Sequence, residues 1–166
     1  MPQGSILGPL LFLLYINDIS NASPKLKCLL FADDTSVFMS HKDLHTLQTD
    51  FNREIELMTQ WLVLNKLSVN KKKTNYMLFT NRKINLDLVT VKMGDSLVNR
   101  VSAIKFLGIN IDDKLTWNIH IGVICNKLSK NIGVMYKLKS LPQNILKMIY
   151  NSIVMPYLTY GIIVWG

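Results

Sequence analysis

The chain has 166 residues, about the size of one domain, and 49% of them are apolar. This composition, with aromatic residues along the whole length, excludes a disordered protein and allows a substantial core. The net charge is +8, and six lysines but no acidic residue follow Asp113. A basic C-terminal part favours a polyanionic partner such as nucleic acid, with a solubilising surface as an equally open interpretation.

Cys28 and Cys125 are isolated in apolar surroundings, so they form neither a disulfide framework nor a metal motif, and an intracellular, reducing compartment is expected. The start "MPQGSILGPL" lacks the charged region of a signal peptide. The apolar run 6–16 is too short to span a bilayer and contains Pro9, which predicts a buried core helix and no membrane partner. Both termini are abrupt, as expected of a piece of a longer polypeptide.

The first part of the chain predicts a turn, a helix and a β-hairpin. A Gly- and Pro-rich turn at 2–5 precedes a helix from 8 to about 18. Two short apolar runs, 26–31 and 35–39, predict strands. The residues between them, 32–34, suit a tight turn because Asp tolerates turn geometry.

The middle of the chain predicts a long helix and further strands. Asp43 can cap a helix that runs to about Leu64. The apolar positions of this helix recur every three or four residues: Leu44, Leu47, Phe51, Ile55, Met58 and Leu62. After it, 74–80 predicts a strand, and the alternating segment around Gly94–Asp95 predicts a hairpin followed by a third strand.

The C-terminal part is predicted to be helical. From Trp117 onward the apolar residues recur at helical spacing: Ile121, Ile124, Leu128, Ile132 and Met135. Pro142 predicts the first turn of a further helix. The order of these elements indicates an α+β fold with an antiparallel sheet.

The segment "CLLFADDTSVF", residues 28–38, places Asp33 and Asp34 between two apolar strands. Adjacent carboxylates repel one another, so a compensating cation is expected there. Mg²⁺ takes oxygen ligands and often binds one or two carboxylates together with water and substrate phosphate. Two such ions can activate an attacking hydroxyl and stabilise a leaving pyrophosphate. Two aspartates in a turn are more often plain solvated residues, but the flanking strands would hold this pair rigidly.

The N-terminal loop, "PQGSILGPLLF", is a second candidate site. Its glycines let the backbone approach a ligand closely, and N–H groups at a helix start can face phosphate. Gln3 adds a donor and an acceptor. Gly and Pro also mark ordinary turns, so this loop alone indicates little.

Four segments in order carry a family resemblance. The first, "PQGSILGPLLFLLYINDI", followed by "LLFADDTSVF", resembles the reverse transcriptases of non-LTR retrotransposons, the jockey-like LINE elements above all. The later segments "WLVLNKLSVNKKKTNYMLF" and "IKFLGINIDDKLTW" resemble the family's next motifs, the second of which forms the primer grip and leads into the thumb. The last segment, "LPQNILKMIYNSIVMPYLTYGIIVWG", is similar to the region after the thumb.

The resemblance covers essentially the whole chain and implies an RNA-directed DNA polymerase. It implies an RNA template, a DNA primer and dNTPs as partners and Mg²⁺ as the cofactor, with Mn²⁺ as an alternative ion. It further implies that residues 1–112 form a partial palm, an antiparallel sheet with helices on one face, and that residues 113–166 form a helical thumb with the segment after it. A nuclear location is implied for the parent element.

The resemblance also implies roles at the nucleotide site. Asp33 would be the direct metal ligand and Asp34 the supporting acid, both of them catalytic. Lys73 matches a lysine that would protonate the departing pyrophosphate, although a solvated lysine beside Lys71 and Lys72 is the simpler interpretation. The residues implied to line the nucleotide are Gln3, Gly4, Phe31 and Ala32.

Two further sets of residues would contact the nucleic acid. Phe106, Leu107 and Gly108 match the primer grip. From the thumb, the lysines expected to contact the duplex backbone are Lys127, Lys130 and Lys137. Lys139 would lie about 200° round the helix from Lys137 and point elsewhere.

One departure from the family pattern concerns the metal site. The family's palm carries a third aspartate on a strand before the PQG loop, whereas this chain has no acidic residue before Asp18. The resemblance therefore implies a fragment without fingers and without the first palm strand, one metal ligand short and inactive alone. The other implied partners are the missing fingers and palm and an upstream endonuclease domain of the same polyprotein.

Several alternatives stay open at this point. The chain is an incomplete polymerase, a non-catalytic remnant that binds RNA or an RNA–DNA hybrid through its basic helices, or a decayed open reading frame without function. The intact motifs and apolar periodicity speak against advanced decay. An RNA-directed RNA polymerase is the remaining enzyme alternative, because the residue that excludes a ribose 2′-OH would lie in the missing segment.

Overall fold

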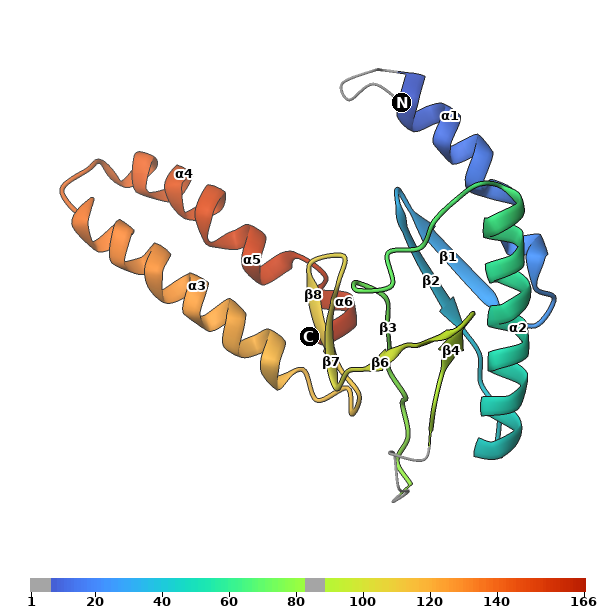
Figure 1. Ribbon diagram of the computed structural model, residues 1–166. Helices are drawn as coiled ribbons and strands as arrows, with labels where there is room; N and C mark the ends of the chain where they lie inside the picture. Colours follow the sequence, from blue (N-terminus) through green and yellow to red (C-terminus); the bar gives the residue numbers. More distant parts are fainter. Residues whose placement is uncertain (1–6, 83–88) are drawn as a thin grey trace. The chain divides into compact units, whose positions relative to one another are not determined.

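The computed structural model describes residues 7–82 and 89–166, and the chain divides into two compact units (Figure 1). Unit 1 consists of residues 1–76 and 83–100, and unit 2 of residues 77–82 and 101–166. Both units mix helices with short strands, which confirms the α+β class at this coarse level. The predicted boundary between residues 112 and 113 falls inside unit 2, and the division into palm and thumb stays a prediction.

The sheets are smaller than the sequence predicted. In the described part of the chain the strands pair two by two: β1 (Lys27–Phe31) with β2 (Asp34–Phe38), β3 (Asn75–Tyr76) with β6 (Asn99–Arg100), β4 (Lys92–Met93) with β5 (Ser96–Leu97), and β7 (Ala103–Phe106) with β8 (Ile109–Asp112). The β3–β6 pair is parallel and the other pairs are antiparallel. Small antiparallel sheets are thus confirmed, but in these residues they do not join into one sheet, and the β3–β6 pair is parallel.

Two strand predictions change in detail. The strand predicted at 74–80 is limited to β3. The hairpin around Gly94–Asp95 is confirmed as β4–β5, with residues 83–88 lying outside the described part. The segment predicted as a single third strand instead folds back on itself as the β7–β8 hairpin.

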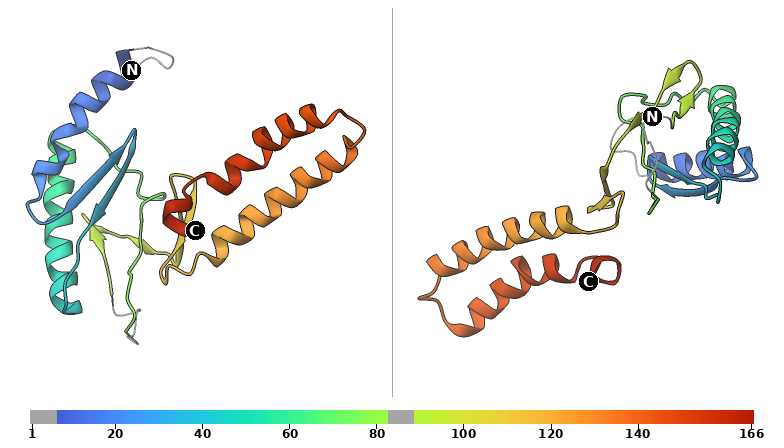
Figure 2. Two further views of the ribbon diagram at one scale, coloured as in Figure 1. Left: turned by 180° about the vertical axis from the view of Figure 1, so that it is seen from behind. Right: turned by 90° about the horizontal axis from the view of Figure 1, so that it is seen from below.

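The core of unit 1 lies between α2 (Leu44–Leu64) and one face of the β1–β2 hairpin, as Figures 1 and 2 show. Its buried residues come from α2, from the helical segment at the start of the chain and from the residue just before β1: Ile16, Ile19, Leu26, Ile55 and Met58. Leu30 and Val37 pack against this cluster from the hairpin. The apolar face of α2 thus packs against the hairpin. Such tertiary packing is the main source of stability for an amphipathic helix.

The start of α2 confirms the predicted cap. The Asp43 carboxylate accepts a 2.7 Å hydrogen bond from the N–H of Thr46 and a 2.8 Å bond from its hydroxyl. These bonds, the backbone one foremost, hold the pKa of Asp43 below its usual value. An acid at this position satisfies one of the free N–H groups of the first turn.

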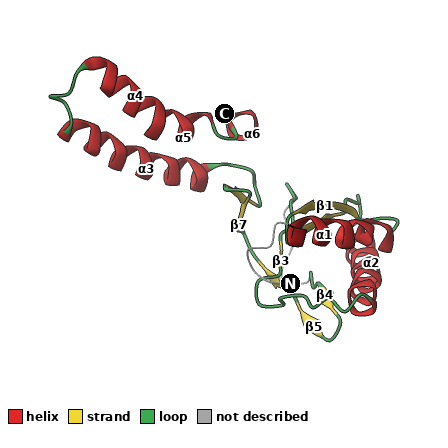
Figure 3. Ribbon diagram, turned by 90° about the horizontal axis from the view of Figure 1, so that it is seen from above, coloured by secondary structure: helices red, strands yellow, loops and turns green. Residues whose placement is uncertain are grey.

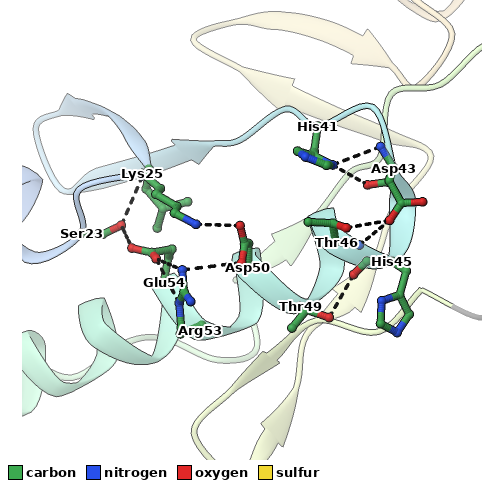
Figure 4. A network of polar contacts seen from close by, with 11 residues as sticks. Ser23, Lys25, His41, Asp43, His45, Thr46, Thr49, Asp50, Arg53 and Glu54 are labelled. Atoms are coloured by element: carbon green, nitrogen blue, oxygen red, sulfur yellow. Dashed lines mark hydrogen bonds and ion pairs between the residues drawn. The ribbon is translucent and has the colours of Figure 1, made fainter.

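A polar network joins the chain before β1 to α2 (Figure 4). The buried Glu54 carboxylate accepts a 2.8 Å bond from the hydroxyl of Ser23 and contacts the guanidinium of Arg53. One turn earlier in α2, Asp50 forms a 2.7 Å ion pair with Lys25. The two contacts hold the same stretch of chain from neighbouring turns of the helix.

The first helix, α1 (Leu7–Ile16), continues as a 3₁₀ helix, η1 (Asn17–Ala22). The prediction that it is a buried core helix is wrong here: Gly8 and Ile16 are buried, but Leu14 is 68% exposed. The helix is apolar on every side, so the contacts it makes in unit 1 cover only part of its surface. In the described residues no helix has the length and apolar content needed to cross a membrane.

Unit 2 is a hairpin followed by a helical pair. The helix α3 (Asn118–Lys137) runs antiparallel to α4 (Gln143–Ile153) and α5 (Met155–Thr159), as Figure 3 shows, and α6 (Ile162–Trp165) ends the chain. The helices predicted after Trp117 and at Pro142 are confirmed, with Pro142 immediately before α4.

The packed side of α3 differs from the predicted one. Ile124 is buried, whereas Ile121 and Ile132, which recur with it at helical spacing, are 42% and 58% exposed. His120 is buried instead, against the ring of Trp165, and the side-chain amide of Asn131 donates to the carbonyl oxygen of Ile153. The packed side of α3 therefore combines part of the apolar stripe with two polar side chains.

Candidate active site

The β1–β2 hairpin places the aspartate pair at its tip. Phe31 pairs with Asp34, so Ala32 and Asp33 form a two-residue loop and Asp34 opens β2. The predicted hairpin, with both aspartates at its tip, is confirmed. The loop is one residue shorter than predicted because Asp34 already belongs to the strand.

The backbone at the tip is constrained. Ala32 has φ 52°, in the left-handed region that two-residue hairpin loops usually fill with Gly. A residue with a side chain adopts this conformation at a cost, and such strain is found most often at functional sites. The tight loop leaves the backbone of Asp33 little freedom.

The two faces of the hairpin have different surroundings. Cys28, Leu30 and Val37 pack toward the core of unit 1, whereas Leu29 and Phe31 are 46% and 57% exposed on the opposite face. Phe31, implied to lie beside the nucleotide, is thus on the accessible face and is the cross-strand neighbour of Asp34. The hairpin is anchored on one side and open on the other.

The donor set at the tip suits magnesium. Both aspartates are exposed and offer carboxylate oxygens, the ligands that this ion prefers. Across residues 7–82 and 89–166, no three His, Cys, Asp or Glu side chains gather as they would around a metal ion. Asp33 and Asp34 could hold a magnesium ion only together with further ligands, and a metal site at this tip stays a prediction.

The remaining nucleotide-site residues are only partly placed. Gln3 and Gly4 lie outside the described residues, so their expected position beside the aspartates stays a prediction. Lys73 belongs to unit 1, in an exposed turn after α2, where its N–H donates to the carbonyl oxygen of Asn70. The neighbouring Lys71 donates to the hydroxyl of Ser96 at 2.9 Å. The catalytic role implied for Lys73 also stays a prediction.

The triplet matched to the primer grip forms a sharp turn. Phe106 ends β7 and pairs with Ile109, and the loop between them has φ 45° at Leu107 and φ 87° at Gly108. Two successive left-handed residues are the signature of the tight hairpin turn that strands favour. Gly108 suits the second central position of such a turn, but Leu rarely occupies the first, so the turn was not predicted from the local pattern. The contact of the triplet with a primer stays a prediction.

The three lysines expected to contact nucleic acid are exposed on α3, within an arc of about 80° by the helical period. The ammonium of Lys127 lies 5.0 Å from the centre of the Tyr157 ring. Lys139 lies beyond Lys137, the last residue of α3, so the helical angle predicted for it does not apply. Its ammonium lies 4.9 Å from the ring of Tyr136.

Asp112 is a residue that the sequence reasoning missed. It is buried at the end of β8, and its carboxylate accepts bonds of 3.0–3.1 Å from the N–H groups of Lys114, Thr116 and Trp117. These bonds, that of Thr116 foremost, hold the pKa of Asp112 below its usual value. The carboxylate thereby fixes the loop that leads to α3. In this loop Leu115 and Trp117 have backbone φ angles in the left-handed region. An Asp placed shortly before a helix is a signal that could have found it.

Comparison with known proteins identifies the family of the chain. A family model described as reverse transcriptase (RNA-dependent DNA polymerase) matches residues 1–111. Over its whole length the chain is 29% identical to the RNA-directed DNA polymerase from mobile element jockey of Drosophila melanogaster, and 29% identical to the probable RNA-directed DNA polymerase from transposon X-element of the same species. It covers 19% of each of these proteins.

A third relative comes from another insect. The chain is 26% identical, over 79% of its length, to a retrovirus-related Pol polyprotein from a type-1 retrotransposable element of Nasonia vitripennis, of which it covers 33%. No solved structure gives a significant match. With the family model spanning more than half of the chain and the aspartate pair inside that span, the chain belongs to the reverse transcriptase family, and it is similar along its whole length to the polymerases of jockey and other non-LTR retrotransposons.

Proposed function

We propose that this chain is part of an RNA-directed DNA polymerase, which extends a DNA primer by copying an RNA template. The observation that carries the proposal is the aspartate pair at the tip of the β1–β2 hairpin, whose inner face is anchored in the core of unit 1. Positioning and electrostatic stabilisation supply most of the catalysis in nucleotidyl transfer, and a rigid element is the best support for both. Similarity to the jockey and X-element polymerases supports the same function.

The aspartates would act through a divalent ion. Asp33 and Asp34 would hold Mg²⁺ or Mn²⁺, which when bound neutralises phosphate charge and makes the primer hydroxyl a better nucleophile. Lys73 would donate a proton to the departing pyrophosphate. The residues proposed to line the incoming dNTP are Gln3, Gly4, Phe31 and Ala32.

Unit 2 would hold the nucleic acid. The turn formed by Phe106, Leu107 and Gly108 would receive the primer end. The exposed lysines of α3 would contact phosphates of the duplex, and such contacts position a nucleic acid without reading its sequence. The backbone contacts are assigned to Lys127, Lys130 and Lys137.

The chain spans 19% of the length of the jockey polymerase, so the complete activity is assigned to a longer polypeptide that adds fingers, further palm and an endonuclease domain. A third carboxylate from that polypeptide would complete the metal site beside Asp33 and Asp34. We therefore expect no primer extension by residues 1–166 alone, because one lost electrostatic contact of this kind commonly costs about 10²–10³-fold in rate.

A chimera tests the proposed function. Residues 1–166 replace the matching segment of the Drosophila melanogaster jockey polymerase, and extension is measured on poly-rA primed with oligo-dT in the presence of Mg²⁺ and dTTP. We expect the chimera to extend the primer and Asp33→Asn to lower the rate by at least about 10²-fold. Asp95→Asn, in the exposed β4–β5 turn, is the matched control and should leave the rate unchanged.

The outcomes separate the two candidate functions. Equal extension by the Asp33→Asn chimera would overturn the assignment of the metal site. A folded chimera that binds the hybrid but does not extend it would favour a non-catalytic nucleic-acid-binding role, carried by the lysines of α3. Extension by residues 1–166 alone, lost in Asp33→Asn, would show that two aspartates suffice.

A further inference from the structure

Tyr160 reaches the β7–β8 turn from near the C-terminal end of the chain. Its hydroxyl donates a 2.6 Å hydrogen bond to the carbonyl oxygen of Leu107. Its ring lies against Gly108, where an added Cβ would come within 3.3 Å of ring atom Cε1. Figure 1 shows α6, which follows Tyr160, beside β8. One side chain therefore contacts both central residues of the turn.

The residue after Tyr160 fits the same hairpin closely. Gly161 has φ +66°, and a Cβ at this position would stand 2.5 Å from Cδ1 of Ile109. A larger residue here would displace the end of the Ile109 side chain and would hold a left-handed φ at a cost in free energy. Gly161 thus allows the close approach that brings Tyr160 onto the turn.

Trp165 contacts the backbone of Tyr160 and is itself packed against His120. The indole N–H of Trp165 donates a 2.9 Å bond to the carbonyl oxygen of Tyr160, and the Trp165 ring meets the buried His120 ring edge-on, with 5.3 Å between centroids. Nδ1 of His120 accepts a 3.3 Å bond from the N–H of Asn110 in β8. The contacts run from Leu107 through these residues back to the hairpin, so they form a closed ring.

The turn needs outside support because of its first residue. Leu107 is left-handed, a conformation that costs free energy for any residue with a β carbon. Strained positions of this kind persist only where the surroundings enforce them. In this conformation the turn accepts the hydrogen bond of Tyr160 and contacts its ring. Tyr160 belongs to a segment that is remote in sequence from the turn.

We infer that Tyr160 is a positioning residue, which holds the Leu107–Gly108 turn in the conformation that receives the primer end. The part that concerns the primer rests on the proposed function. The support of the turn by Tyr160 rests on the contacts alone. Two measurements separate these parts.

Hydrogen exchange tests the support of the turn. Tyr160→Phe keeps the ring and removes the hydroxyl, so exchange of the amides at 106–110 should become roughly 2- to 10-fold faster, as expected for the loss of one hydrogen bond. Trp165→Phe removes the bond to the Tyr160 carbonyl and should act in the same direction. Tyr136→Phe, whose side chain is 70% exposed on α3, is the control. Unchanged exchange in Tyr160→Phe would overturn the inference.

A fluorescent primer tests positioning. An RNA–DNA hybrid with 2-aminopurine at the primer 3′ end is titrated with the chain. Tyr160→Phe should lose most of the fluorescence change seen with the wild type, while the Kd changes by less than about twofold because phosphate contacts dominate it. A full fluorescence change in the variant would overturn the positioning role. Absence of any hybrid binding by the wild type would overturn the proposed function and this role together, and the exchange result would still report on the turn.

Discussion

The Ser23 hydroxyl donates a 2.8 Å hydrogen bond to the Glu54 carboxylate. Ser23 lies in the segment before β1 and Glu54 in the middle of α2, and both residues are buried. This bond is the main cause that holds the pKa of Glu54 below its usual value, with Arg53 acting in the same direction. Burial of an ionised carboxylate is tolerated here because it is hydrogen-bonded and paired. The bond links acid–base chemistry to the stability of unit 1.

The stability of unit 1 should therefore depend on pH through Glu54. Its pKa is lower in the folded chain than in the unfolded one, so its contribution is complete above the ordinary value near 4.3 and is lost as the pH falls through the lowered folded value. We expect Glu54→Gln to melt at a lower temperature than the wild type at pH 7, with the gap narrowing below about pH 4. Circular dichroism melts across this range measure it.

The control for this prediction lies on the same helix. Glu56 is exposed, so Glu56→Gln should follow the wild type at every pH. Ser23→Ala should resemble Glu54→Gln at pH 7, because it leaves the carboxylate without its main donor. A gap between Glu54→Gln and wild type that stays constant from pH 7 to pH 3 would contradict the pKa argument.

The core of unit 1 offers a direct test of packing. Ile55 is 3% exposed at the centre of the cluster between α2 and the hairpin. Ile55→Ala should lower the free energy of unfolding by about 2–5 kcal/mol through lost burial and a cavity. Leu64→Ala, at an 82% exposed position on the same helix, should change it by less than about 0.5 kcal/mol. Urea unfolding followed by tryptophan fluorescence measures both, and similar losses would show that the cluster is not the core.

The lysines of α3 should control the salt dependence of hybrid binding. Each phosphate contact contributes a slope near −0.9 in the plot of log affinity against log salt for B-form DNA. Replacing Lys127, Lys130 and Lys137 together by Gln should therefore flatten the slope by about 2–3. Fluorescence anisotropy with a labelled RNA–DNA hybrid gives the slope.

An equal loss of charge elsewhere is the matched control. The exposed residues for this second triple replacement are Lys92, Lys139 and Lys147. It should leave most of the slope intact. Equal flattening by both replacements would indicate a diffuse positive surface, and α3 would have no special part in binding.

The exposed surface of α1 should make the isolated chain associate. Leu10 and Leu14 are 55% and 68% exposed on a helix that is apolar on all sides, and large apolar patches promote association. The double change Leu10→Lys with Leu14→Lys should reduce light scattering at matched concentration. The same change at Val63 and Leu64, which are 68% and 82% exposed at the end of α2, should reduce it less. A monodisperse wild-type chain at high concentration would refute this prediction.

The elements that could be predicted from the sequence are those for which local signals agree. Asp43 caps α2 and the spacing of Ile55 and Met58 fixes its buried face, so pattern and structure coincide. The aspartates stand at a hairpin tip because apolar runs flank a residue pair that suits a turn. Consistency between local and global preferences is what makes such segments predictable.

The features that the sequence did not predict depend on long-range contacts. The turn at Leu107 and Gly108 has Leu at a position that rarely holds it, and the contact of Tyr160 with this turn comes from a remote part of unit 2. The packed side of α3 includes His120 and Asn131, whose partners lie near the C-terminus, and a count of apolar residues cannot find them. In the candidate site the aspartates were predictable, whereas the support of the primer-grip turn depended on the fold.

The two units are interleaved along the polypeptide, since unit 2 takes residues 77–82 from between the two parts of unit 1. A recombination crossover before residue 77 keeps all of unit 2 together but separates residues 83–100 from the rest of unit 1. A crossover after residue 100 keeps all of unit 1 together but separates residues 77–82 from the rest of unit 2. Genetic recombination with a single crossover therefore cannot exchange one unit between related elements without mixing parental sequences inside at least one of them.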